Sequence, residues 1–230
     1  MGRRLGLWAI WSGFILYVLL FAPPLQLDTF QPLQTLLTGR LPYINPVLIS
    51  LFSMVGIWLL IYSCLIFPDG RMQRLPAWAF MLASAGSGVL ALIPYLALRE
   101  PNQRFSGRLG TGLGLLESRF TGLVLSISTL VLLAFALFFG DWLAYAYEFQ
   151  TNKFVHGMSL AFVLFCLLFP YPTLLSDDMA RRGLTSNSQL FGLTALIPLF
   201  GPLFYLCVRP PLLGSRQEQV RDRIPQVTQR

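Results

Sequence analysis

Six long apolar runs, separated by short polar segments, dominate this chain of 230 residues. Each run approaches the roughly 17–25 residues that an α-helix needs to cross a bilayer core about 30 Å thick. Charged residues make up only 12% of the chain, about half of the roughly 25% typical of soluble domains. We therefore expect an all-α integral membrane bundle of about six transmembrane helices. It forms a single domain over 1–208, with spans over 5–22, 47–67, 77–98, 120–139, 154–175 and 190–208.

The charged residues lie between these apolar runs and in a polar, basic C-terminal tail over 209–230. The formal net charge is +7. This distribution suits contact with anionic lipid headgroups, whereas nucleic-acid recognition would need a contiguous basic face. The lipid bilayer is therefore an expected partner, and nucleic acid is not.

None of the six expected spans contains Asp, Glu, Lys or Arg. A charge at the centre of a span costs roughly 2.5–3.5 kcal/mol on insertion scales, so it is retained where it has a function. Its absence argues against a proton-coupled carrier and against intramembrane metalloproteases or aspartyl proteases. We predict no catalytic residue and no metal site, and we do not expect an enzyme.

Small residues are concentrated in two of the spans. The stretch 83–88 reads Ala-Ser-Ala-Gly-Ser-Gly, and a Gly and a Ser lie four residues apart in the next span. Small side chains let a second helix approach closely, although Ser84 and Ser87 could instead line a narrow path. The helix-packing candidates are Gly86, Gly88, Gly122 and Ser126.

Helix-breaking residues interrupt two of the spans. Proline removes an amide donor and kinks a helix. Broken helices occur at transport sites, although a kink packed against neighbouring helices is the commoner outcome. The hinge candidates are Pro94 in the third span and Pro198, Gly201 and Pro202 in the last.

His156 is the only histidine, and it lies near the start of the fifth span. A single histidine in this position is usually hydrogen-bonded at the interface, and the alternative is an axial ligand of a tetrapyrrole. The isolated cysteines at 64, 166 and 207 are typical of structural thiols. We therefore predict no cofactor, with a pigment or haem at His156 as the alternative.

Two charged segments are expected at the surface. The segment 99–119 carries four arginines, and its glycine-rich part lacks the preceding strand and the lysine of a phosphate loop, so we predict a flexible loop. The segment 177–183 pairs acids with arginines at i and i+4. It should form one or two exposed helical turns that stop at Gly183.

The positive-inside rule gives conflicting indications of the membrane orientation. Arg3 and Arg4 indicate a cytoplasmic N-terminus, and six spans return the tail to the same side. The same topology places the four arginines of 99–119 on the opposite side, against the rule. We keep the arrangement with both termini inside as the expectation.

Four segments carry a family resemblance. They are Phe67-Pro68-Asp69-Gly70-Arg71, Leu75-Pro76-Ala77-Trp78, the stretch 92–99 and Leu115-Leu116-Glu117-Ser118-Arg119. In these segments, within the middle third of the chain, the sequence resembles a family of uncharacterised multi-pass membrane proteins of cyanobacteria and chloroplasts. The resemblance implies a thylakoid or bacterial plasma membrane location and supplies no catalytic residues.

We expect a non-enzymatic multi-pass membrane protein, an accessory or assembly factor that acts through helix–helix contacts. Its partners would be other subunits of a larger membrane complex, such as a photosynthetic one. The alternative is a transporter or channel for a neutral or weakly polar solute, with the interrupted spans as its flexible parts.

Overall fold

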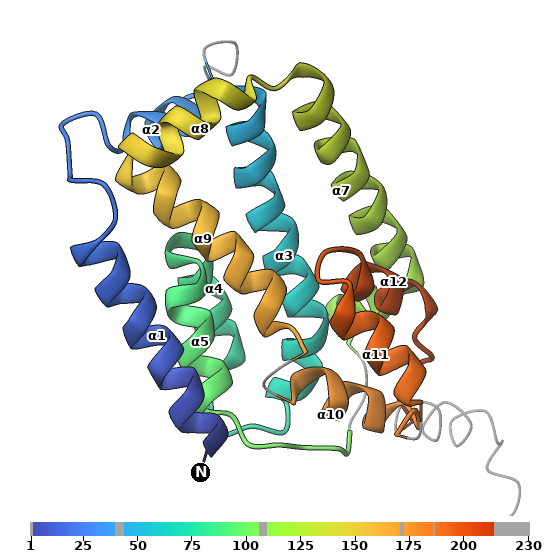
Figure 1. Ribbon diagram of the computed structural model, residues 1–230. Coiled ribbons are helices and arrows are strands. Elements are labelled where there is room, and N and C mark those ends of the chain that lie inside the picture. Colours follow the sequence, from blue (N-terminus) through green and yellow to red (C-terminus); the bar gives the residue numbers. More distant parts are fainter. Residues whose placement is uncertain (1, 40–43, 106–109, 171–172, 186, 214–230) are drawn as a thin grey trace, which may run out of the picture.

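The structure is a computed structural model that describes residues 2–39, 44–105, 110–170, 173–185 and 187–213. Every regular element in these residues is a helix, which confirms the all-α class. The helices in chain order are α1 (Gly2–Leu20), α2 (Gln31–Leu37), α3 (Pro46–Gly70), α4 (Ala77–Ser87), α5 (Val89–Leu98), α6 (Thr111–Glu117), α7 (Arg119–Phe139), α8 (Trp142–Thr151), α9 (Lys153–Leu168), α10 (Leu174–Arg181), α11 (Ser188–Leu196) and α12 (Phe200–Val208) (Figure 1).

Three of these helices, α1, α3 and α7, are long and apolar enough to cross a membrane. A fourth crossing is available if α8 and α9 count as one span, although they are bent by 103° where they meet. The described residues therefore hold three or four candidate crossings, not the six expected from the apolar runs. The difference arises in the third and last runs, each of which is divided into two short helices.

The third expected span is a helical hairpin of α4 and α5. Gly88, the residue between them, has φ +60° and ψ −129°, a conformation open to glycine because it lacks a Cβ. The rings of Phe80 and Tyr95 pack with centroids 5.5 Å apart. The Gln73 amide donates to the Glu100 carbonyl and accepts from its N–H, at 2.7 and 2.9 Å. These contacts show that α5 returns to the end at which α4 began.

The last expected span is also a pair of helices. α11 and α12 lie against each other, joined by a short connection that contains Pro198. Gly201, at the start of α12, lies so close to α11 that an added Cβ would be 2.5 and 2.8 Å from the carbonyl oxygens of Thr194 and Leu193. Only glycine permits this approach, so the break is a packed turn and not a mild kink.

The core lies between α3, α5 and α9, where aromatic side chains interlock. Trp58 and Tyr62 of α3 pack against Phe169, with ring centroids 5.9 and 5.5 Å apart. The Tyr62 hydroxyl donates to the carbonyl of Phe165 at 2.9 Å. This packing joins the first half of the chain to the second.

The two halves repeat one order of elements, as Figure 1 shows. A long helix, a short helix, a second long helix and a helical hairpin occur as α1, α2, α3 and α4–α5, and again as α7, α8, α9 and α11–α12, with the additional helix α10 before the second hairpin. The second long helix of each half runs into Cys-Leu-x-Phe-Pro, at 64–68 and 166–170. Each hairpin leads into Tyr-Leu-x-x-Arg, at 95–99 and 205–209. Matching motifs at matching positions indicate an internal duplication.

The fold-back of α4–α5 also resolves the orientation conflict. Because α5 returns to the face at which α1 begins, the segment that follows it lies on that face as well (Figure 1). We call this the arginine-rich face, and the positive-inside rule predicts that it is the cytoplasmic one. Of the described basic residues, Lys153 lies at the opposite face. The arginine-rich face holds Arg3, Arg4, Arg71, Arg74, Arg99, Arg104, Arg119, Arg181, Arg182 and Arg209.

Cysteine labelling tests this arrangement. In a variant without native cysteines, Gln103→Cys should react with a membrane-impermeant maleimide from the same side as Arg4→Cys. Tyr147→Cys should react from the other side. All three positions are exposed. A six-span bundle requires the reverse for both Gln103 and Tyr147, so labelling of intact and inverted vesicles separates the two topologies.

Candidate functional site

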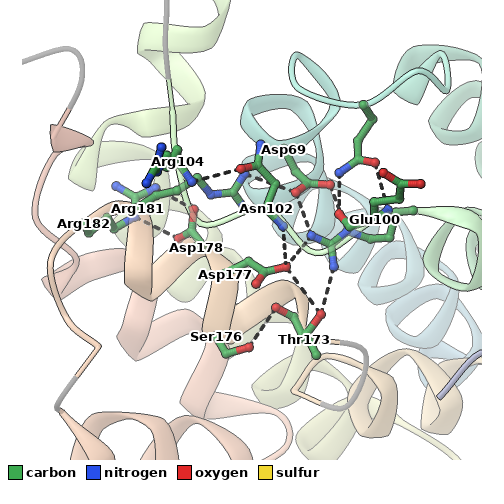
Figure 2. Close-up of polar contacts among 12 residues, drawn as sticks. Asp69, Glu100, Asn102, Arg104, Thr173, Ser176, Asp177, Asp178, Arg181 and Arg182 are labelled. Carbon is green, nitrogen blue, oxygen red and sulfur yellow. Dashed lines mark hydrogen bonds and ion pairs between the residues drawn. The ribbon is translucent and has the colours of Figure 1, made fainter. Parts of the chain in front are cut away.

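A buried cluster of charged side chains lies at the arginine-rich face, and Figure 2 shows part of it. Four carboxylates and four guanidinium groups come from the ends of α3, α5, α6 and α12 and from α10. Their side chains are at most 7% exposed. Buried charges are tolerated when each is paired, and equal numbers of the two signs allow this. The ion-pair cluster consists of Asp69, Arg99, Glu117, Asp177, Asp178, Arg181, Arg182 and Arg209.

Arg99 holds the first half of the cluster together. Its Nε and Nη2 donate to the two oxygens of Asp69 at 2.9 and 2.7 Å, and Nη2 also lies 2.6 Å from Asp177 Oδ2. The Tyr95 hydroxyl donates to Asp69 Oδ2 at 3.2 Å. Burial alone would lower the pKa of Arg99, but its bonds to the two carboxylates raise it above the usual value. Arg99 therefore stays charged and joins the end of α5 to α3 and α10.

Asp178 is the centre of the second half. It accepts from Arg182 Nε and Nη2 at 2.8 and 3.1 Å and from the Tyr205 hydroxyl at 2.7 Å. Arg209 Nη1 lies 3.8 Å from it. Burial alone would raise the pKa of Asp178, but the guanidinium groups of Arg182 and Arg209 lower it to about 2. The Tyr-Leu-x-x-Arg motif thus meets an aspartate in both halves of the duplication.

Two contacts join the first and second halves of the ion-pair cluster. Asp177 of α10 binds Arg99, and Arg181 Nη1 lies 3.2 Å from Asp69 Oδ1.

The spacing of charges in 177–183 predicts exposed turns with both acid–arginine pairs formed along one helix. The helix is present and Gly183 follows it with φ +75°, but only the pair Asp178–Arg182 forms, and the prediction of exposure is wrong. The charged residues are buried because α10 packs beneath the end of α3.

The segment 99–119 also differs from the expected flexible loop. Arg99 is buried, and Glu117 ends helix α6 with Oε2 2.8 Å from Arg182 Nη1. Residues 106–109 lie outside the described residues. The described part of this segment therefore contributes one residue of each sign to the ion-pair cluster.

The ion-pair cluster holds helix ends together. Its carboxylates are paired with arginines, so none is available as a general base. Within the described ranges, no three His, Cys, Asp or Glu side chains are grouped to hold a metal ion. The arrangement clamps the base of both hairpins to the ends of α3 and α10.

A second candidate site is an apolar pocket of about 460 Å³ between helices of the first half of the chain and α9. It is an open pocket lined by α1, the segment 25–33, α3, the turn between α4 and α5, and α9. Each of the hydroxyls in its wall makes a hydrogen bond within the protein. Ser84 and Ser87 donate to carbonyls one turn back at 2.7 and 2.9 Å, and Thr29 accepts from Gln26 N–H at 2.8 Å. A molecule in this pocket would meet an apolar surface.

Among the described residues in the wall of this pocket, Lys153 is the one that carries a charge. It begins α9 at the face opposite the ion-pair cluster, and its Nζ lies 3.5 Å from the Leu19 carbonyl. No described carboxylate lies within ion-pair distance of it. The pocket therefore combines an apolar body with a cation at one end.

The helix-packing candidates have different surroundings. Gly86 lines the pocket, and a Cβ there would meet nothing within 4 Å. Gly88 forms the hairpin turn and faces Phe165. Gly122 of α7 lies against the backbone of α12, where a Cβ would be 2.8 Å from the Leu206 carbonyl carbon. Ser126 bonds back to the Gly122 carbonyl at 2.8 Å.

The hinge candidates lie at or near the helical hairpins. Pro94 is inside α5, which continues through it, so Gly88 is the break in that region. Pro198 lies in the connection between α11 and α12, and Gly201 and Pro202 are in the first turn of α12. The last span is therefore interrupted where its prolines predict, but by a full reversal of the chain.

His156 has both ring nitrogens in hydrogen-bonding distance of protein groups. Nδ1 lies 2.9 Å from the Phe149 carbonyl oxygen, and Nε2 lies 3.1 Å from the Tyr17 hydroxyl. Since a carbonyl only accepts, Nδ1 donates to it, and both ring nitrogens are thereby held by protein groups. The ring also stacks on Phe149, with centroids 4.4 Å apart. This geometry fits a structural histidine better than an axial ligand.

Sequence reasoning missed both the ion-pair cluster and the pocket. The cluster's partners are far apart in the chain, and each charged residue lies just outside an apolar run, where solvent exposure is the default expectation. The repeated Cys-Leu-x-Phe-Pro and Tyr-Leu-x-x-Arg motifs were available as a signal. They would have indicated that the charged ends of the two halves are equivalent.

Comparisons with protein-family models, characterised proteins and solved structures find no match to this chain.

Proposed function

We propose that this protein is a non-enzymatic membrane protein that binds a weakly polar molecule from the bilayer and acts as a carrier for it. The apolar pocket supports this proposal best. Its volume of about 460 Å³ falls within the roughly 300–1,000 Å³ typical of small-molecule sites. It lies beside α1, whose one fully buried residue is Leu7.

The wall of the pocket limits the class of molecule. Its serine hydroxyls donate within the protein and its charged side chain, Lys153, lies at one end, so a solute that is polar along its whole length would gain few partners for the hydration that it loses. The α4–α5 turn forms one side of the pocket, while the ion-pair cluster clamps the base of the same hairpin. A fixed base and a glycine turn at the pocket suit a hairpin whose tip adjusts to a ligand.

Filling the pocket tests this function. Gly86→Leu places a side chain into open space at the pocket wall, so it should reduce ligand occupancy by about tenfold without unfolding the protein. Native mass spectrometry of the purified protein measures how much co-purified small molecule is retained. Gly192→Leu is the matched control, because Gly192 is also helical and open but lies outside the pocket. Equal occupancy in both variants would contradict the proposal.

A role as an accessory or assembly factor is the second candidate. It is favoured by α7, whose only buried residues are Gly122, Leu125, Thr129 and Ala136, so most of its apolar surface is available to another helix. The resemblance to cyanobacterial and chloroplast proteins supports placing such a complex in a bacterial plasma or thylakoid membrane. Co-purification of a stoichiometric membrane partner after gentle extraction would support this role over the carrier.

A further inference from the structure

We infer that the pocket holds an anionic amphiphile, with one hydrocarbon chain along α9 and an anionic headgroup at Lys153. This inference rests on the proposed function, because it names the ligand class of the same pocket. Three features carry it: the length of the pocket, the chemistry of its wall and the position of its cation.

The length is set by the face of α9 that lines the pocket. Lys153, Gly157, Ala161 and Phe165 follow one another at intervals of four residues and all contribute to the wall. Twelve residues of helix extend over about 18 Å at 1.5 Å per residue. Half of a bilayer core is about 15 Å thick. The pocket therefore runs from one interface to mid-depth, the distance covered by one hydrocarbon chain.

The wall of the pocket along this length is apolar and suits a hydrocarbon chain. Phe14 and Val18 of α1 line it together with Phe165 of α9, and a Cβ added at Gly88 would lie 3.8 Å from the Phe165 ring. The serine hydroxyls at the α4 end donate to their own helix, and the described residues of the wall place no charged side chain at that far end. A charged headgroup therefore finds its counter-charge at the end near Lys153.

The charge at that end selects an anion. Lys153 has no carboxylate within ion-pair distance among the described residues, and its ammonium reaches only the Leu19 carbonyl, at the 3.5 Å limit of a hydrogen bond. A carboxylate or phosphate would provide the charge-assisted partner that this ammonium lacks. A neutral alcohol offers a weaker bond, and a cationic headgroup would be repelled. Free fatty acids and anionic phospholipids share this chemistry.

Binding to the full-length protein in a neutral maltoside detergent tests the inference. The probes are radiolabelled palmitate, hexadecanol, phosphatidylglycerol and phosphatidylcholine. We expect palmitate or phosphatidylglycerol to be retained about tenfold more than its uncharged or zwitterionic counterpart. Lys153→Gln should remove this preference, and Lys153→Arg should keep it. Lys153 is partly exposed, so neither change should alter the gel-filtration profile.

The outcomes separate the ligand class from the pocket itself. Preference for palmitate alone identifies a free acid, and preference for phosphatidylglycerol identifies a lipid phosphate; both support the inference. If hexadecanol binds as well as palmitate and Lys153→Gln changes nothing, the anionic ligand is overturned, while loss of binding in Gly86→Leu still supports the pocket. If Gly86→Leu binds every probe like the unaltered protein, the proposed function fails as well.

Discussion

Replacing Arg99 by methionine should strongly reduce accumulation of the protein in the membrane. Arg99 is fully buried and holds Asp69 through two hydrogen bonds and Asp177 through a third. Its removal leaves two buried carboxylates without their main partner, which costs about 3–5 kcal/mol. Folded proteins are stable by only about 5–15 kcal/mol, so this loss is a large part of the total. Membrane-fraction immunoblots and thermal unfolding of the purified protein measure the effect.

Two further variants show whether the ion pair itself is responsible. Arg104→Met removes an arginine from the same segment, but that residue is exposed, so stability should change little. Arg99→Lys keeps the charge without the planar two-point contact to Asp69, and it should be intermediate. If Arg99→Met unfolds at the temperature of the unaltered protein, the cluster is not the clamp inferred from its geometry.

Gly122→Val should separate α7 from α12. A Cβ at this position would lie 2.8–2.9 Å from backbone atoms of Leu206 and Cys207, and a backbone cannot rotate away as a side chain can. Such overpacking costs about 1–3 kcal/mol or more. Each kcal/mol lowers the melting temperature by roughly 2–4 °C in a protein of this size. Differential scanning fluorimetry in detergent is a suitable measurement.

Gly13→Val is the matched control for this change. Gly13 also lies within a long apolar helix, but a Cβ there meets nothing within 4 Å. The two substitutions introduce the same side chain with the same β-branched helix propensity, so a difference between them reports on packing. Equal melting temperatures for the two variants would show that α7 and α12 do not approach as closely as described.

The ion-pair cluster contains related contacts from the two halves of the internal duplication. Tyr95 and Arg99 hydrogen-bond to Asp69, while Asp178 accepts from Tyr205 and lies 3.8 Å from Arg209. In both cases a helical hairpin is fastened at its base to an aspartate of a preceding element. The pocket lies at the tip of the first hairpin, at the end remote from the clamp.

Several properties of this protein follow from the sequence alone. Apolar runs over 5–22, 47–67 and 120–139 coincide with α1, α3 and α7, because crossing a membrane depends on local length and composition. Asp178 and Arg182 form the pair that i to i+4 spacing predicts, since helical geometry is also local. The all-α class rests on the same local physics.

Only the tertiary structure decided where the chain turns back and which charges meet. The apolar run through Gly88 continues without a polar break, so composition indicates one span, whereas a single residue with positive φ produces a hairpin. That reversal brings Arg99 to the face where Asp69 and Asp177 lie. Partners of a buried ion pair are chosen by the packing of distant helices, and no local pattern of residues contains that information.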